Sequence, residues 1–391
     1  MPISLPLKSP ADHACVLIAA QSGRSLAAAA RRAGYLPLVA DMFGDMDTLE
    51  TAAAYRPLSG RFGTGIRESS VLPVLESLAA SVASSPIGVV LGSGFEASPA
   101  VIDAIDRRFG VIGASAAAVR QLKDPVSLAA LLERLHVPHP KIRLKKVSRP
   151  AGLLQKRKGG SGGGHIRPAS PDHLPRGFYL QKRVGGRSVS VAFLADGESA
   201  VTLATTDQWT SPSRRAPWRY GGAIEPGNLA QEIASEVEAA ILGIVRSTGL
   251  RGLASADILV DGQRWWMLEI NPRPGATMDV LDRRARPLFQ QHIDACRGVL
   301  NTPEPAPRGA SGTKIVYARR TVPVVPTIDW PTFVMDRPQP NSTIRAGAPI
   351  CTVAAVAPNT STVRSLLDQR ESEALGLLYN GRPGEGIVRA A

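Results

Sequence analysis

Three oxygen-bearing side chains in one short stretch of this chain could bind a divalent cation. Glu269 and Asn271 are two residues apart in an apolar run, and Asp257 lies twelve residues before Glu269. Side chains of a strand alternate between its two faces, so Glu269 and Asn271 share one face. Two carboxylates and a carboxamide suit a hard cation such as Mg²⁺, which takes further ligands from nucleotide phosphates and water. Arg273, next in step beyond the strand end, would then hold a phosphoryl or acyl-phosphate oxygen.

The surrounding residues 254–277 predict a β-hairpin that positions these side chains. Apolar, β-branched and aromatic residues flank the turn formers Asp261 and Gly262. Pro272 ends the second strand, because proline cannot donate to a ladder.

The length of the turn decides whether Asp257 belongs to the site. Asp257 shares the face of Glu269 only if the turn holds an odd number of residues, such as a three-residue loop from Asp261 to Gln263. A two-residue turn would place Asp257 on the opposite face. The alternative interpretation is the polar face of a solvated hairpin that binds no metal.

A second chemical feature is the glycine-rich loop at 157–164, which follows a predicted strand at 153–156. Glycines let backbone N–H groups approach phosphate oxygens closely, and the flanking lysines would neutralise their charge. The loop lacks the fixed spacing of a P-loop. We therefore predict a phosphate-binding flap. A flexible linker is the alternative, although linkers rarely lie between two apolar strands.

The distribution of charge favours a phosphorylated ligand over nucleic acid. The chain carries a formal net charge of +13, and residues 121–190 hold fifteen basic against three acidic side chains. This segment contains the glycine-rich loop, so a polyphosphate explains its charge as well as a DNA backbone would. Neither interleaved aromatic residues nor a nucleic-acid-binding module is visible, which disfavours a nucleic-acid partner.

Composition indicates a globular protein of 391 residues, of which 44% are hydrophobic. No apolar run is long enough to span a membrane, and the run at 15–20 is too short for a signal-peptide core. We expect a cytoplasmic protein without a membrane partner. The three cysteines fit neither a disulfide framework nor a zinc site.

The N-terminal third alternates strands and helices. A strand at 16–20, a helix at 26–33 and a strand at 36–40 form one βαβ pattern, and a strand at 87–91 precedes a helix at 99–108. A dinucleotide fingerprint is absent, so NAD is not expected. Ligands of such sheets gather beyond the carboxyl ends of the strands. The candidates to line this crevice and bind a substrate carboxylate are Ser22, Gly23, Gly94 and Glu96, with ordinary turn chemistry as the alternative.

Periodicity predicts a short strand at 111–113 and longer strands at 179–194 (interrupted at 185–186), at 200–205, near 313–318 and near 350–356. It predicts helices at 126–135, 229–248 and 279–299. Residues 302–309 are predicted to form a proline-rich linker.

Over residues 15–300 these motifs resemble the ATP-grasp superfamily, in particular its carboxylate–amine ligases. The resemblance implies a mixed α/β and α+β fold in four parts. These are an N-terminal Rossmann-like domain at 1–120, an ATP-grasp small subdomain with the flap at 121–180, a large subdomain with the metal site at 181–304, and a C-terminal β-rich accessory domain at 305–391.

The resemblance also implies ATP and Mg²⁺ as cofactors, with Mn²⁺ as an alternative ion. Its nucleotide contacts correspond to Lys123, Lys156, the flap residues Gly159, Gly160, Ser161, Gly162 and Gly163, and the hinge residues Gln181, Lys182 and Val184. The metal ligands correspond to Asp257, Glu269 and Asn271. The resemblance further implies that Arg273 acts in catalysis together with Glu269 and Asn271 and that it contacts the substrate.

Two departures from the family pattern concern the hinge. Lys182 stands where an acidic residue is usual, although the adenine contact there is made by the backbone. The acid that usually holds the ribose has no counterpart at 185–189. Ribose recognition therefore differs from the family pattern.

The implied reaction activates a carboxylate with the γ-phosphate of ATP and joins it to an amine, so both partners are small molecules. Among relatives, the loop at 92–96 and the C-terminal tail look most like tyramine–glutamate ligases of one-carbon cofactor (methanofuran and methylofuran) synthesis. A phosphoribosylaminoimidazole-type or D-alanine-type ligase is the alternative within the class. A non-catalytic nucleotide- or nucleic-acid-binding protein on this fold is the alternative outside it. The oligomeric state is open, with a homodimer as one candidate.

Overall fold

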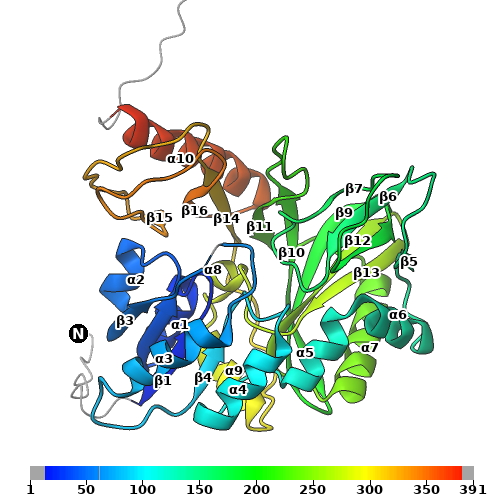
Figure 1. Cartoon of the computed structure of the whole chain (residues 1–391), viewed down its shortest axis with the longest axis horizontal. Helices are drawn as coiled ribbons and strands as arrows, with labels where there is room; N and C mark the ends of the chain where they lie inside the picture. The colour runs from blue at the N-terminus through cyan, green and yellow to red at the C-terminus, as the bar shows by residue number, and fades with distance from the viewer. Residues whose placement is uncertain (1–13, 61, 381–391) are drawn as a thin grey trace, which may run out of the picture.

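The computed structural model describes residues 14–60 and 62–380, and its N-terminal part is a parallel sheet flanked by helices (Figure 1). The sheet order is β3-β2-β1-β4. The strands are β1 (Cys15–Ala19), β2 (Leu36–Asp41), β3 (Ala54–Pro57) and β4 (Val89–Leu91), and the helices are α1 (Arg24–Arg32), α2 (Met46–Thr51), α3 (Glu68–Ala79) and α4 (Pro99–Phe109). The predicted βαβ pattern is confirmed, and Gly34 follows α1 with φ +85°. The elements α2, β3 and α3 were not predicted from the sequence, and the strand expected at 111–113 is only a bridge from Val111 to Val89.

Two helices lead into a small antiparallel sheet that carries the glycine-rich loop. The helices are α5 (Ala116–Lys123), which was not predicted, and α6 (Pro125–Arg134). The strands are β5 (Ile142–Arg143), β6 (Leu153–Arg157), β7 (Arg167–Pro168) and β8 (Phe178–Lys182), in the order β5-β8-β6-β7. The loop joins β6 to β7, as expected for a flap between strands.

The largest sheet has eight strands in the order β13-β12-β9-β10-β11-β14-β16-β15. Its bounds are β9 (Arg187–Asp196), β10 (Ala200–Thr210), β11 (Tyr220–Glu225), β12 (Arg251–Asp261), β13 (Arg264–Asn271), β14 (Ala310–Tyr317), β15 (Val334–Met335) and β16 (Pro349–Ala357). The predicted hairpin at 254–277 is therefore the β12–β13 pair at one edge.

Alternate residues of the central strands fill two cores on opposite faces of this sheet. Val191 and Phe193 of β9 belong to the cluster that includes Val237 of α7 (Gln231–Thr248). Leu194 belongs to the opposite cluster with Phe289 of α9 (Leu288–Cys296). The period of two thus lets one strand bury both faces, and the sheet becomes a rigid platform.

The C-terminal segment does not form a sheet of its own, because β14 pairs with β11 and extends the large sheet. The 21-residue helix α10 (Thr360–Asn380), missed by sequence analysis, lies across β14 and β16 (Figure 1). The single helix predicted at 279–299 is wrong. The chain forms α8 (Met278–Leu281) and then α9, with Pro287 between them, since proline lacks the N–H that a continuous helix would need. The four-domain division stays a proposal.

Across the described ranges 14–60 and 62–380, no helix combines the length and apolarity needed to cross a membrane.

Candidate ligand site at the sheet edge

The turn between β12 and β13 has two residues. Asp261 pairs directly with Arg264, which leaves only Gly262 and Gln263 in the turn. Gly262 has φ +62°, the conformation that glycine adopts without strain. The three-residue loop considered for this turn is therefore wrong.

A β-bulge nevertheless places Asp257 on the face of Glu269. The register pairs Ile258 with Met267 but Asp257 with Glu269, so Leu268 is an extra residue in β13. One extra residue inverts the alternation of faces beyond it. The odd count that the site needs is thus supplied by the bulge and not by the turn.

The three predicted metal ligands form one hydrogen-bonded cluster. Asn271 Nδ2 donates to Asp257 Oδ2 at 2.9 Å, and Ser190 Oγ donates to Asp257 Oδ1 at 2.7 Å. Lys123 Nζ donates to Asn271 Oδ1 at 2.8 Å and lies 3.4 Å from Glu269 Oε2. The lysine that the resemblance assigns to phosphate binding therefore balances the acidic cluster in this structure.

The two carboxylates of the cluster differ in their electrostatics. Burial, reinforced by the nearby Glu269, raises the pKa of Asp257 to about 6. Burial would also raise the pKa of Glu269, but the cationic Lys123 and Lys156 outweigh it and lower that pKa to about 2. Glu269 is therefore fully ionised at neutral pH, and Asp257 is ionised in most molecules.

The donor set fits Mg²⁺ as an ion that shares its ligands with a nucleotide. The cluster offers two carboxylates and one carboxamide oxygen, the ligand types that Mg²⁺ prefers. Within the part of the chain that the structure describes, no group of three or more His, Cys, Asp or Glu side chains could hold a metal ion. If Mg²⁺ binds here, the three side chains would supply part of its coordination shell, and phosphate and water would complete it.

A pocket beside the cluster brings together several residues assigned to the nucleotide. It encloses about 340 Å³, part of it open to solvent. Lys156 is 6% exposed, and its Nζ donates to Gln181 Oε1 at 3.2 Å. The lining residues of the predicted set are Lys123, Lys156, Gly159, Gly160 and Glu269.

The other predicted nucleotide contacts do not line this pocket. Lys182 is exposed, and its backbone N–H donates to the carbonyl of Lys141. Val184 follows β8 and is half-buried. Ser161, Gly162 and Gly163 also lie outside the lining. Their role in nucleotide binding stays a prediction.

Two glycines allow the flap to pack closely against other loops. A Cβ on Gly159 would lie 2.5 Å from Ala97 Cα, and a Cβ on Gly163 would lie 1.9 Å from the Trp218 carbonyl oxygen. Both residues have φ near +65°. The carbonyl of Gly162 also accepts a hydrogen bond from Tyr220 N at 3.0 Å. Glycine is required here for packing as well as for any phosphate contact.

His165, which was not predicted from the sequence, lines the same pocket. Burial lowers the pKa of His165 to about 4, against the opposing effect of Glu269. The imidazole is therefore neutral at pH 7. The sequence signal for including His165 was its position directly after the glycine run. The flap continues through His165 until β7 begins at Arg167.

Arg273 and Glu96 form a buried ion pair beside a second pocket. Arg273 Nε donates to Glu96 Oε1 at 2.7 Å, and Gly94 N donates to Glu96 Oε2 at 2.7 Å. Burial would raise the pKa of Glu96, but Arg273 and Lys123 lower it below its usual value. The structure thus brings together Gly94, Glu96 and Arg273, and their role in substrate binding stays a prediction.

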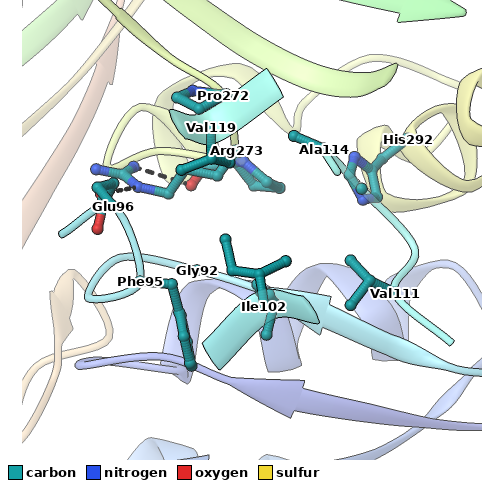
Figure 2. Close-up of a pocket in the computed structure, with 13 residues that line it drawn as sticks. Gly92, Phe95, Glu96, Ile102, Val111, Ala114, Val119, Pro272, Arg273 and His292 are labelled. Atoms are coloured by element: carbon teal, nitrogen blue, oxygen red, sulfur yellow. Dashed lines mark hydrogen bonds and ion pairs between the residues drawn. The ribbon is translucent and has the colours of Figure 1, made fainter. Parts of the chain in front are cut away.

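The second pocket encloses about 370 Å³, part of it open to solvent. Figure 2 shows Arg273 reaching across to Glu96, with Phe95 and Ile102 on the opposite wall and His292 at the far end. Most of the lining is apolar, so a small molecule in this pocket would meet charge only at the Arg273 end.

The structure corrects the prediction that a substrate carboxylate binds at the start of α1. The N–H of Gly23 donates to Asp41 Oδ2 at 2.8 Å, so a carboxylate of the protein already takes this donor. The N–H of Gly94 is likewise used by Glu96. Ser22 lines neither pocket. The reason is the pairing of β2 with β1, which brings Asp41 at the end of β2 beside the donor at the start of α1.

Parts of this chain are similar to known proteins. Residues 122–277 match the family model described as an ATP-grasp domain. A D-alanine–D-alanine ligase of Rhodospirillum rubrum is 30% identical over 114 residues, which are 28% of this chain and 37% of that ligase. The match thus spans little more than a third of the length of this curated relative.

Solved structures share the fold over most of the chain. The biotin carboxylase domain of the Hydrogenobacter thermophilus 2-oxoglutarate carboxylase, in complex with MgADP and bicarbonate, has a TM-score of 0.70 at 13% identity and covers 91% of this chain and 89% of that one. An N5-carboxyaminoimidazole synthase from Aspergillus clavatus, in complex with ADP and 5-aminoimidazole ribonucleotide, has a TM-score of 0.67 at 14% identity and covers 92% and 99%. At these identities the likeness shows the fold alone.

Proposed function

We propose that this chain, which contains an ATP-grasp domain over residues 122–277, is an ATP-dependent carboxylate–amine ligase that uses Mg²⁺. The observation that carries the proposal is the convergence of chemistry on one pocket. The flap and the buried Lys156 line it together with Glu269, and Asp257 lies directly opposite Glu269 on the neighbouring strand. Cationic side chains and oxygen ligands at one point suit a polyphosphate with its metal.

The proposed reaction has two steps. A carboxylate oxygen attacks the γ-phosphorus of ATP, the bond to the β–γ bridging oxygen breaks, and ADP leaves. An amine nitrogen then attacks the carbonyl carbon of the acyl-phosphate, loses a proton, and displaces phosphate to give the amide. Positioning and charge neutralisation dominate such phosphoryl transfer, so no covalent attachment to the protein is needed.

Each functional side chain has a defined task in this scheme. Lys156 neutralises phosphate oxygens, and Lys123 can do so once a metal balances the carboxylates. Asp257, Glu269 and Asn271 would hold Mg²⁺, which supplies charge neutralisation at the transferring phosphate. Arg273, held by the buried Glu96 through its Nε and by the Pro274 carbonyl through its Nη1, keeps Nη2 for an oxygen of the acyl-phosphate.

For the substrates we propose glutamate and tyramine, on the resemblance of the loop at 92–96 and the C-terminal tail to ligases of one-carbon cofactor synthesis. The apolar wall of the pocket beside Arg273 supports an amine that carries an apolar group. The partial match to a D-alanine–D-alanine ligase favours a pair of D-alanines as the second candidate.

The test is a coupled assay on the full-length chain with ATP and Mg²⁺. Glutamate with tyramine, D-alanine alone, and a panel of other carboxylates and amines are supplied in turn. We expect ADP and phosphate to appear in equal amounts, with the amide identified by mass spectrometry. Nucleotide binding without phosphate release for any pair would favour the non-catalytic alternative. Failure to bind ATP would overturn both.

A further inference from the structure

The flap contacts the turn that joins β10 to β11, at residues 211–219. The backbone N–H of Tyr220, the first residue of β11, donates to the carbonyl of Gly162 at 3.0 Å. A Cβ on Gly163 would lie 1.9 Å from the carbonyl oxygen of Trp218, so the two backbones are in direct contact. Both flap residues lie outside the pocket lining, so these contacts leave the pocket itself free. The position of the flap therefore depends on the position of this turn.

One arginine fixes the 211–219 turn in place. Arg219 Nε donates to the carbonyl of Ser211 at 2.9 Å, and Arg219 Nη2 lies 3.3 Å from Ser211 Oγ, so this side chain joins the two ends of the turn. Arg219 Nη1 donates to the carbonyl of Gly347 at 2.8 Å. The guanidinium also stacks on Tyr317, with Cζ 3.4 Å from the centroid of the ring. A planar guanidinium can do both, because its donors point outward in the plane and its face stays free for the ring.

The partners of Arg219 outside the turn belong to the C-terminal segment, residues 310–380. Tyr317 ends β14, and Gly347 precedes β16. The hydroxyl of Tyr317 also donates to the carbonyl of Tyr220 at 2.8 Å. The backbone of Tyr220 thus accepts from the C-terminal segment through its carbonyl and donates to the flap through its N–H. A continuous path of contacts therefore runs from β14 to the flap.

This path gives the C-terminal segment a way to act on a site that it does not reach. Among the described residues of this segment, none lines either of the two pockets. The flap residues Gly159 and Gly160 do line the candidate nucleotide pocket, a few positions before the contact with Tyr220. Firm anchoring of the flap at Gly162 would thus limit its opening beside the pocket.

We propose that Arg219 is a positioning residue, through which the C-terminal segment holds the flap over the candidate nucleotide pocket. The predicted effect on nucleotide binding rests on the proposed function, because it requires ATP in that pocket. Loss of the arginine frees the 211–219 turn, and the flap then opens more often. ATP leaves a site with an open flap more readily, so its affinity falls.

The experiment measures backbone amide exchange of residues 158–166 by mass spectrometry on the full chain without nucleotide, and then the dissociation constant of ATP with Mg²⁺. Arg219→Ala removes all the contacts of the side chain, whereas Arg219→Lys keeps the charge without the planar fork. Tyr317→Phe removes only the hydroxyl that donates to Tyr220. Arg215→Ala is the matched control, because Arg215 is exposed in the same turn. Exchange in β1, which is buried in the N-terminal sheet, reports any global loss of stability.

We expect Arg219→Ala to accelerate exchange at 158–166 roughly tenfold, the scale of one or two lost hydrogen bonds, while exchange in β1 stays unchanged. The dissociation constant of ATP should rise roughly threefold to tenfold. Arg219→Lys should recover part of both effects, and Tyr317→Phe should show smaller changes in the same direction. Arg215→Ala should behave like wild type.

Two results would overturn the inference while the proposed function stands. One is unchanged exchange at 158–166 in Arg219→Ala, and the other is equal acceleration at 158–166 and in β1. Faster exchange of the flap with unchanged ATP affinity would overturn the effect on nucleotide. If wild type binds no ATP, the proposed function fails and the effect on nucleotide fails with it, and the exchange rates then decide the link between Arg219 and the flap.

Discussion

Asp257 and Glu269 lie directly opposite each other on β12 and β13, and the bulged residue Leu268 is the reason. Without the bulge, the two-residue turn would direct the two carboxylates to opposite faces of the sheet. Bulges next to functional sites commonly redirect side chains in this way. The extra residue Leu268 therefore helps to position the proposed metal ligands, although its own side chain has no polar or charged group.

Glu269→Gln tests the proposed metal site. The substitution keeps the size of the side chain but removes the negative charge of this proposed metal ligand. We expect turnover to fall roughly 100-fold or more, because a preorganised electrostatic contact to the transition state is lost. ATP binding through Lys156 and the flap should persist. Product formation and the dissociation constant of ATP are measured on the same preparations.

Glu238→Gln is the control for that substitution, because Glu238 is exposed on α7. Its turnover should match wild type. Unchanged turnover in Glu269→Gln would remove Glu269 from the site.

Glu96→Gln tests whether the ion pair positions Arg273. Each oxygen of Glu96 accepts one hydrogen bond, from Arg273 Nε and from Gly94 N. Glutamine has only one accepting oxygen, so one donor would face an NH₂ group. We expect turnover to fall roughly tenfold to 100-fold with little change in ATP affinity, since a hydrogen bond to a charged group is weakened. A parallel loss of ATP affinity would point to a disturbed nucleotide pocket instead.

Lys123→Ala and Lys156→Ala test whether the basic segment acts through direct contacts. Both lysines are buried beside Glu269, whereas Lys145 and Lys146 are exposed. We expect ATP affinity to fall roughly tenfold or more for each buried lysine and less than about threefold for each exposed one. If all four variants bind ATP alike, the positive charge acts only as a diffuse field.

Arg24→Ala tests a buried ionic link between α1, α8 and the C-terminal segment. Arg24 is 6% exposed at its side chain and lies 2.5 Å from Asp279 and 2.9 Å from Asp336. Removing it leaves two largely buried carboxylates without their cation. We expect the free energy of unfolding in urea to fall by about 3–5 kcal/mol.

The comparison variant is Arg264→Ala, whose partner Asp261 and own side chain are both exposed. Its loss should be below about 1 kcal/mol. Similar losses for Arg24→Ala and Arg264→Ala would contradict the assigned role of the buried link.

His292 should make stability depend on pH. Its Nδ1 accepts from Leu253 N at 2.8 Å, its Nε2 lies 2.9 Å from the Ile112 carbonyl oxygen, and burial lowers the pKa of His292 to about 4. In the unfolded chain its pKa is near 6.5, so between pH 6.5 and 4 the unfolded state binds the additional proton. This stabilising contribution is complete above pH 6.5 and is lost as the pH falls towards 4.

The measurement compares urea unfolding of wild type and His292→Asn from pH 7.5 to 4.5. Asparagine can still accept from Leu253 N but does not titrate. We expect wild type to lose up to about 1.4 kcal/mol more per pH unit than the variant inside this window. Parallel curves would show that His292 does not titrate on unfolding.

Several features of this protein follow from its sequence alone. The period of two assigns Glu269 and Asn271 to one face, and the helical period from 229 to 248 predicts α7, which ends at Gly249 in the left-handed conformation. The glycine-rich loop between two strands was equally visible. These features depend on neighbours within a few positions along the chain, so propensity and periodicity are sufficient to predict them.

Other features were decided only by tertiary packing. The bulge at Leu268 sets the face of Asp257, and no local pattern of the hairpin indicates it. Arg273 meets Glu96 across 177 residues of sequence. The donor at Gly23 is taken by Asp41, which a separate strand brings beside it. Strand register, ion pairs between distant segments and the satisfaction of a buried donor are settled by which surfaces pack together, and that information is not contained in any short stretch of the chain.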